Sequence, residues 1–176
     1  MLAGPVLVVG FLPFGGVRDN PAARLARAVD GRRAGGRRVR GEAIPVSYAR
    51  GPAETLRFVR LLRPVAVLGV GVATSRPAAE LERWARPGCT APGADVDGAR
   101  LPAEDGPPRP LFDGGLAAAL RVGMSDDAGG YVCNGWAWAV SGAAGCPVGF
   151  LHVPEQGFCP ARLLAGLAAW ALPLEG

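Results

Sequence analysis

One cysteine of this chain stands where a turn is predicted to lead into a helix. In the stretch Gly129–Trp136, the two leading glycines permit a tight turn with positive φ, and apolar side chains from Asn134 onward have helical spacing. Cys133 therefore lies near the start of the predicted helix. The free N–H groups and the positive end of the helix dipole there favour a thiolate over a thiol. The position suits a nucleophile, although a small buried cysteine that packs a helix start is the commoner case.

A base for this thiol has one source, because His152 is the sole histidine of the sequence. It stands near the end of a predicted strand, where a buried core histidine is the ordinary alternative. A Cys–His pair also needs a third group that orients the imidazole. Glu82 is our choice, because its place beyond the predicted strand 65–70 lets it reach the same edge. Glu80 shares its face in an extended segment, so spacing alone does not separate the two acids.

Three apolar runs predict the strands that would position these residues: 5–11, 65–70 and 147–153. Each run is continuous rather than alternating, which is typical of central strands buried on both faces of a parallel sheet. Helices are predicted from Pro21 behind the capping residue Asn20, over 52–62 with Leu56, Val59 and Leu62 facing inward, and from Pro160. Strands and helices thus alternate along the chain.

This alternation predicts an α/β fold. We expect a single domain over residues 1–176, with three α/β/α layers around a mostly parallel twisted central sheet. A weaker strand is predicted over 39–45, a short one over 80–85, and a long surface excursion over 86–115. In open α/β sheets the functional site lies at the carboxyl ends of the strands. The predicted strand ends should therefore bring His152 and the 71–82 segment close to Cys133.

Composition and charge exclude several classes of protein. The net charge is +4 and every basic residue is arginine, but the arginine cluster of residues 32–40 has no aromatic residue interleaved with it. We therefore expect no nucleic-acid partner. The apolar run 2–11 lacks a basic start and is too short to span a bilayer, so we expect no membrane partner. The four cysteines form no Cys-x-x-Cys pair, which predicts free thiols in a cytoplasmic protein and no zinc site.

Four sequence blocks resemble, in order, the motifs of one known family. They are Gly10-Phe11-Leu12-Pro13-Phe14-Gly15-Gly16 with Asn20-Pro21, then Val70-Gly71 with Arg76 and Glu82-Arg83, then Gly130-Tyr131-Val132-Cys133-Asn134, and finally Gly149 to Gln156 around His152. Together the blocks resemble the pyroglutamyl peptidase I, or pyrrolidone carboxyl peptidase, family of cysteine peptidases. The resemblance runs across nearly the whole chain.

The resemblance implies a catalytic triad of Glu82, Cys133 and His152. The implied reaction removes an N-terminal pyroglutamyl (5-oxoprolyl) residue from a peptide through a thioester acyl-enzyme, without a metal or cofactor. The family's phenylalanines match Phe11 and Phe14, which would wall the pocket for the lactam ring. Tyr131 stands where the family often has another aromatic residue. The resemblance also implies assembly into a tetramer or dimer.

Two departures from the family pattern keep alternatives open. Val72 stands where the family commonly has a glutamine that helps to shape the pocket, and Pro92 stands where it has an arginine. These losses are compatible with a catalytically silent member that binds pyroglutamyl N-termini. A nucleotide-binding α/β domain is the other alternative, because the glycine-rich stretch 69–74 follows a predicted strand. That loop lacks a following helix, since Pro77 intervenes, and no acidic residue ends a clear next strand.

Overall fold

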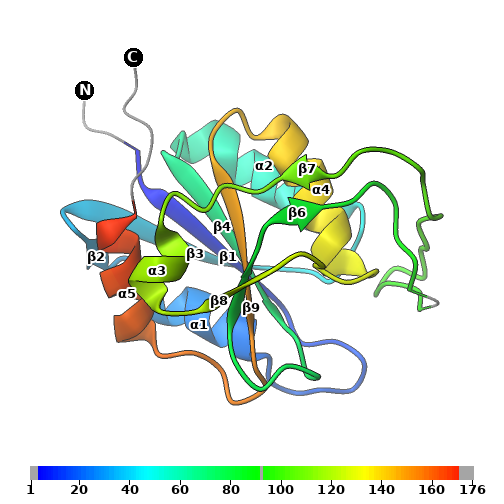
Figure 1. Cartoon of the computed structure of the whole chain (residues 1–176), viewed down its shortest axis with the longest axis horizontal. Helices are drawn as coiled ribbons and strands as arrows, with labels where there is room; N and C mark the ends of the chain where they lie inside the picture. The colour runs from blue at the N-terminus through cyan, green and yellow to red at the C-terminus, as the bar shows by residue number, and fades with distance from the viewer. Residues whose placement is uncertain (1–3, 92, 171–176) are drawn as a thin grey trace.

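The protein has a central β-sheet with helices on both faces, and the computed structural model describes residues 4–91 and 93–170 (Figure 1). Seven strands form the sheet in the order β2-β3-β1-β4-β9-β5-β8. Their bounds are β1 Val6–Phe11, β2 Arg33–Ala34, β3 Arg37–Ile44, β4 Ala66–Val72, β5 Glu80–Glu82, β8 Gly123–Ser125 and β9 Val148–Val153. The neighbours β3, β1, β4 and β9 are parallel, whereas β2 is antiparallel to β3 and β5 to β9. The expectation of a mostly parallel α/β sheet is confirmed.

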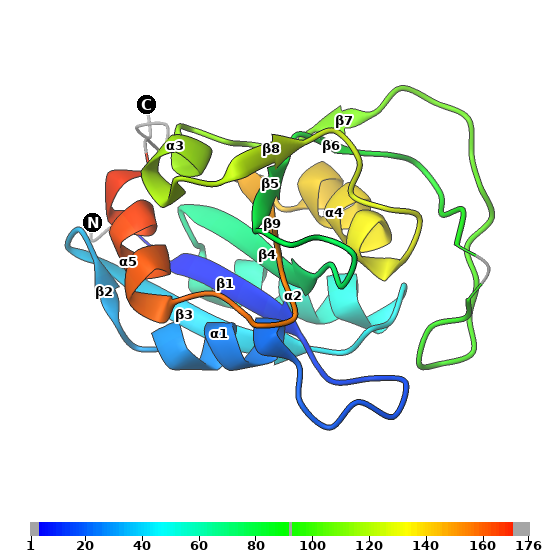
Figure 2. The same cartoon turned by 60° about the horizontal axis from the view of Figure 1, so that its bottom comes forward.

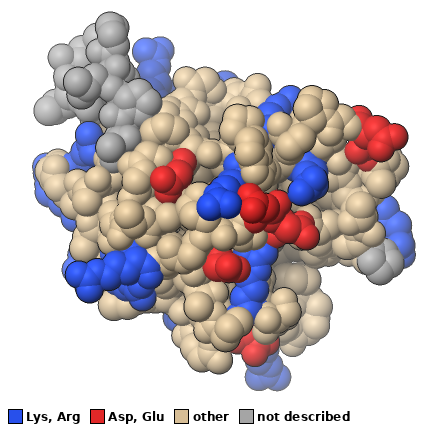
Figure 3. All heavy atoms as spheres, in the orientation of Figure 1, with Lys and Arg blue, Asp and Glu red and all other residues tan. Residues whose placement is uncertain are grey.

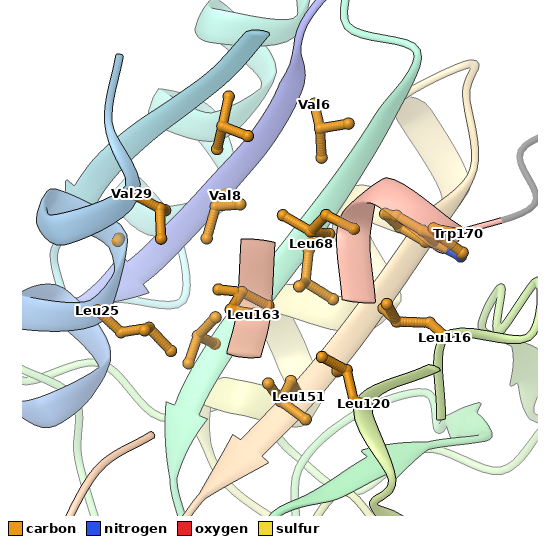
Figure 4. Packing of buried hydrophobic residues seen from close by; sticks show 14 of the residues in the cluster. Val6, Val8, Leu25, Val29, Leu68, Leu116, Leu120, Leu151, Leu163 and Trp170 are labelled. Atoms are coloured by element: carbon orange, nitrogen blue, oxygen red, sulfur yellow. The ribbon is translucent and has the colours of Figure 1, made fainter. Parts of the chain in front are cut away.

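Helices cover the two faces of the sheet and create two apolar cores. One face carries α1 (Pro21–Val29), α3 (Leu116–Leu120) and α5 (Pro160–Ala169), and the other carries α2 (Arg50–Leu62) and α4 (Val132–Ala143). Figure 4 shows side chains of α1, α3 and α5 meeting those of β1, β4 and β9 on the first face. Every residue of β1 and β9 is buried, as their continuous apolar sequences predict.

The predicted helix starts are correct where a capping residue marks them. Asn20 accepts a hydrogen bond from the N–H of Ala22, and Pro21 opens α1 as expected. The inward face predicted for α2 is only partly right. Leu56, Val59 and Leu62 are half-buried, and the fully buried residues of α2 are Gly51, Pro52 and Thr55. Trp136 of α4 packs there and donates from Nε1 to the Thr55 hydroxyl at 2.9 Å, so the closest contact lies at that end of the helix.

Short elements differ most from the sequence predictions. The strand predicted over 80–85 stops at Glu82, and β6 (Trp84–Ala85) turns away to pair with β7 (Arg109–Pro110) in a separate ribbon. Strand β8 is not among the strands predicted from the sequence. Helix α4 begins at Val132, so Cys133 lies within its first turn rather than just before it. The excursion after β6 extends beyond α4, as Figure 2 shows.

Basic and acidic side chains are interspersed on the face of the molecule that Figure 3 shows. On the face seen in Figure 3, arginines lie beside acidic residues, and Arg83 pairs with Asp126 at 3.1 Å. All four cysteines are free. Within residues 4–91 and 93–170, no helix has the length and apolar character that a membrane crossing requires.

Candidate active site

The nucleophile candidate Cys133 packs against strand β4 at a glycine, where no side chain separates the thiol from the backbone of the strand. An added Cβ on Gly71 would lie 2.8 Å from Cys133 Sγ, and one on Gly69 would lie 2.4 Å from Trp136 Cζ3. These two glycines of β4 therefore let the first turns of α4 approach the sheet closely. The chain after β4 forms a turn closed by Arg76 N–H and the Ala73 carbonyl at 3.0 Å, and no helix follows it. The glycine-rich stretch thus serves packing, which removes the basis for a nucleotide-binding loop.

His152, the penultimate residue of β9, connects the thiol to an acid. Its Nδ1 lies 2.6 Å from Oε1 of Glu82, and its side chain lines the same pocket as that of Cys133. Because Nδ1 serves Glu82, Nε2 is the nitrogen left for the thiol. Burial opposes charge on the ring, but hydrogen bonds with Cys133 and Glu82 outweigh it and raise the pKa of His152 to about 9. The imidazolium form therefore persists well above neutral pH.

Glu82 is the acid that meets His152, which resolves the choice between the two glutamates. In the antiparallel register Glu80 lies directly opposite His152, yet Glu82 reaches it diagonally across the strands. The Glu82 side chain is fully buried, whereas Glu80 remains partly exposed. Burial favours the neutral acid, but hydrogen bonds from His152, Ser125 and Arg76 hold the pKa of Glu82 below its usual value. Its second oxygen, Oε2, is buried without a partner at normal hydrogen-bond geometry among the described residues.

A pocket of about 240 Å³ opens beside the thiol and the imidazole. All four substrate-pocket residues proposed from the sequence line it: Phe11, Phe14, Val72 and Tyr131. The rings of Phe14 and Tyr131 lie 6.1 Å apart, and the Tyr131 hydroxyl donates to the Ala94 carbonyl at 2.7 Å. The pocket lies at the carboxyl ends of β1, β4 and β9. These strand ends point downward in Figure 1.

Several residues near the site were not selected from the sequence. Asn20, Val46, Ser75, Arg76 and Ala128 also line the pocket. Asn134, buried in the first turn of α4, accepts from the Arg86 N–H at 2.8 Å and donates to the Arg86 and Gly88 carbonyls. It therefore fixes the start of the long excursion against the nucleophile helix. A buried polar residue directly after a candidate nucleophile is the signal that points to such a role. Pro92 lies outside the described residues.

In the part of the chain that the structure describes, no group of three or more His, Cys, Asp and Glu side chains is arranged to hold a metal ion. The chemistry that the described side chains offer is that of a thiol, an imidazole and a carboxylate in a row. Such a row is the arrangement that nucleophilic acyl transfer requires.

Comparison with known proteins places the chain in one family. The family model described as pyroglutamyl peptidase matches residues 5–111. A pyrrolidone-carboxylate peptidase of Chromobacterium violaceum is 30% identical over 97% of this chain and 85% of the relative, and that of Thermococcus litoralis is 31% identical over 85% and 76%. The solved pyrrolidone carboxyl peptidase of Thermococcus litoralis matches with a TM-score of 0.79 and 26% identity, covering 94% of this chain and 90% of that one. Pyroglutamyl peptidase I from Bacillus amyloliquefaciens shares the fold with a TM-score of 0.82 at 23% identity, covering 97% and 94%. This chain therefore belongs to the pyroglutamyl peptidase family.

Proposed function

We propose that this protein is a cysteine exopeptidase that removes N-terminal pyroglutamyl residues from peptides, with Cys133, His152 and Glu82 as its catalytic residues. The observation that carries the proposal is the row formed by the thiol, the imidazole and the buried carboxylate at the wall of an aromatic pocket. Membership of the pyroglutamyl peptidase family supports the substrate class.

The proposed reaction proceeds in two acyl-transfer steps. The Cys133 thiolate attacks the carbonyl carbon that links the pyroglutamyl residue to the next residue. The N–H groups in the first turn of α4 have no partner within the helix and stabilise the oxyanion. The imidazolium of His152 then gives its proton to the leaving amine, and the C–N bond breaks to leave a thioester. Water activated by the now neutral His152 attacks the thioester, which releases pyroglutamate and restores the thiolate.

The pocket favours a neutral ring over a charged amino terminus. Its described lining residues include Phe11, Phe14 and Arg76 but no Asp or Glu. A free ammonium would enter beside a guanidinium and without a carboxylate partner, while the Cys133 thiolate is already paired with the His152 imidazolium; such poorly compensated burial costs several kcal/mol. The lactam of a pyroglutamyl residue carries no charge and does not meet this penalty. N-terminal glutamine, glutamate and proline each bring a protonated nitrogen.

A comparison of four substrates tests the proposal. Pyroglutamyl, glutaminyl, glutamyl and prolyl amides of one fluorescent amine are assayed for kcat/KM. We expect cleavage of the pyroglutamyl amide alone, with a high KM because Val72 offers no side-chain hydrogen bond to the lactam. Comparable cleavage of all four would mean that the pocket does not recognise the lactam. Calorimetric binding of a pyroglutamyl peptide without any cleavage would support the catalytically silent alternative.

Two further properties belong to this proposal. We propose that the chain acts as one domain over residues 1–176 in the cytoplasm, and its four free thiols support that compartment. We also propose assembly into a dimer or tetramer, which rests on the resemblance of the sequence to its family. Light scattering at several concentrations distinguishes these assemblies from a monomer.

A further inference from the structure

One arginine of the site touches both the acid of the triad and the loop that leads to the nucleophile. Arg76 donates from Nη1 to Oε1 of Glu82 at 2.6 Å, and the same nitrogen lies 3.0 Å from Oε2 of Glu80. Its other terminal nitrogen, Nη2, donates to the Asp127 carbonyl at 2.6 Å. The planar guanidinium can hold these partners together because its donors point in fixed directions.

The two ends of this contact belong to different parts of the fold. Arg76 comes from the turn after β4, and its side chain is 21% exposed at the wall of the pocket. Asp127 belongs to the loop that connects β8 to α4, and Cys133 follows in the first turn of that helix. The loop has its own bonds, from Gly129 N–H to the Asp127 carboxylate and from Asp127 N–H to Ser125 Oγ. Arg76 thus connects an ordered loop to the acid.

The electrostatics around Glu82 show what the arginine balances. Glu80 and Glu82 lie on the same face of β5 and share the Arg76 Nη1 atom. His152 faces Glu82 from β9 and Ser125 faces it from β8, while Cys133 lies beyond the imidazole on α4. The nearby exposed charges pair elsewhere, since Arg83 bonds to Asp126. Without the guanidinium, two carboxylates would stand close together, and their mutual repulsion would favour protonation of one of them.

We propose that Arg76 is a positioning residue with two separable tasks. Its charge keeps Glu82 ionised beside Glu80, so that Glu82 orients His152. Its fork of donors holds the Asp127 carbonyl and thereby the loop that places Cys133. This role rests on the proposed triad, but it can be tested without the peptidase assay. The rate at which iodoacetamide alkylates Cys133 also depends on the ionised state of Glu82, because Glu82 acts on Cys133 through His152.

Four variants separate the two tasks. Arg76→Met removes both charge and fork, Arg76→Lys keeps the charge alone, and Arg76→Met with Glu80→Gln removes the repelling neighbour as well. Arg83→Met is the control for the charge task, because Arg83 pairs with Asp126 of the same loop but makes no contact with the Glu82 carboxylate among the described residues. For each we measure the pH profile of kcat and kcat/KM on a pyroglutamyl amide, the pH profile of Cys133 alkylation by peptide mapping, and the melting temperature.

We expect Arg76→Met to move the acid limb of both profiles upward by about one pH unit or more, because Glu82 then shares its site with an unbalanced like charge. The added Glu80→Gln change should move the limb back. Arg76→Lys should keep the limb of the unmodified protein but lower kcat by about tenfold, because one ammonium does not replace both arms of the fork. Arg83→Met should leave the acid limb unchanged, because it removes no positive charge from the Glu82 carboxylate.

The proposal fails if Arg76→Met keeps the original limb, or if Glu80→Gln does not restore it. Should Arg76→Met not fold, Arg76→Lys decides, since a shifted limb or an unchanged kcat in that variant overturns the proposal. If no variant, nor the unmodified protein, cleaves the amide while the alkylation profiles shift as expected, the peptidase function fails and the role of Arg76 stands. If the protein cleaves the amide but neither the alkylation profile nor the activity profile shifts in the variants, the peptidase function stands and the proposed role of Arg76 fails.

Discussion

Cys89 and Cys133 both lie near the start of α4, yet their surroundings differ in kind. Cys89 is buried, and its Sγ contacts the Tyr131 carbonyl at 3.5 Å. Burial raises the pKa of its thiol despite hydrogen bonds with Tyr48 and Asn134. Cys133 opens into the pocket and has His152 beside it. We therefore expect Cys133 rather than Cys89 to be the nucleophile, because only Cys133 has an imidazole partner that a carboxylate orients.

Replacing each thiol in turn tests this comparison with the largest expected effect. Cys133→Ser should lower kcat/KM by on the order of 10⁴ or more, because the hydroxyl is a far weaker nucleophile next to the same imidazole. Cys89→Ala should keep most of the activity and lower stability by about 1 kcal/mol through a small cavity. Kinetic assays and thermal melts of both variants provide the measurement. Loss of turnover in Cys89→Ala with an intact fold would reverse the assignment.

Changing the acid tests whether the partner of Cys133 must itself be oriented. Glu82→Gln should lower kcat by about two powers of ten, since the imidazole loses its carboxylate partner. Glu82 also raises the pKa of His152, so its removal should move the basic limb of activity from about pH 9 to lower pH. The pH dependence of kcat/KM measures both effects. Glu80→Gln is the control and should cost far less; a larger loss there than in Glu82→Gln would contradict the assigned register.

A pair of glycine substitutions sharpens the comparison with a smaller effect. The Cβ of Gly71→Ala would press on Cys133 Sγ at 2.8 Å, and that of Gly135→Ala would lie 3.3 Å from Cys89 Sγ and 3.0 Å from Tyr48 Cδ1. We expect Gly71→Ala to lower kcat about tenfold, because a displaced nucleophile loses its attack geometry. Gly135→Ala should change kcat less and act mainly on the melting temperature. The opposite order would mean that the Cys89 region controls the site.

The sequence predicts the long elements well because burial on both faces leaves a simple pattern. Continuous apolar runs indicate β1, β4 and β9, and Asn20 with Pro21 marks the start of α1. Strands β2 and β8 are too short to show any periodicity, and β8 pairs with β5, which lies far earlier in the sequence. The partial burial of Leu56 on α2 could not be predicted either, because the position of Trp136 on α4 decides which part of α2 is covered.

In the candidate site, too, the sequence identifies some residues, whereas other contacts are visible only in the structure. Residue type and motif order select Cys133 and His152, and the structure brings both together with Glu82. Their catalytic roles remain predictions. Spacing cannot separate Glu80 from Glu82, because the choice depends on a diagonal reach between two twisted strands. The contacts of Arg76 are equally invisible in the sequence, since they join residues from three separate segments.

The place of β9 in the sheet also fixes when the site can exist. Strands β4 and β5 follow each other along the chain, but β9, the last strand, lies between them. Until β9 has been synthesised, β4 has an open edge and β5 has no link to the parallel core. Until then Glu82 also lacks its hydrogen-bond partner His152, which lies 70 residues further along the chain. We therefore expect a chain that ends before β9 to contain Cys133 without His152 and to lack peptidase activity.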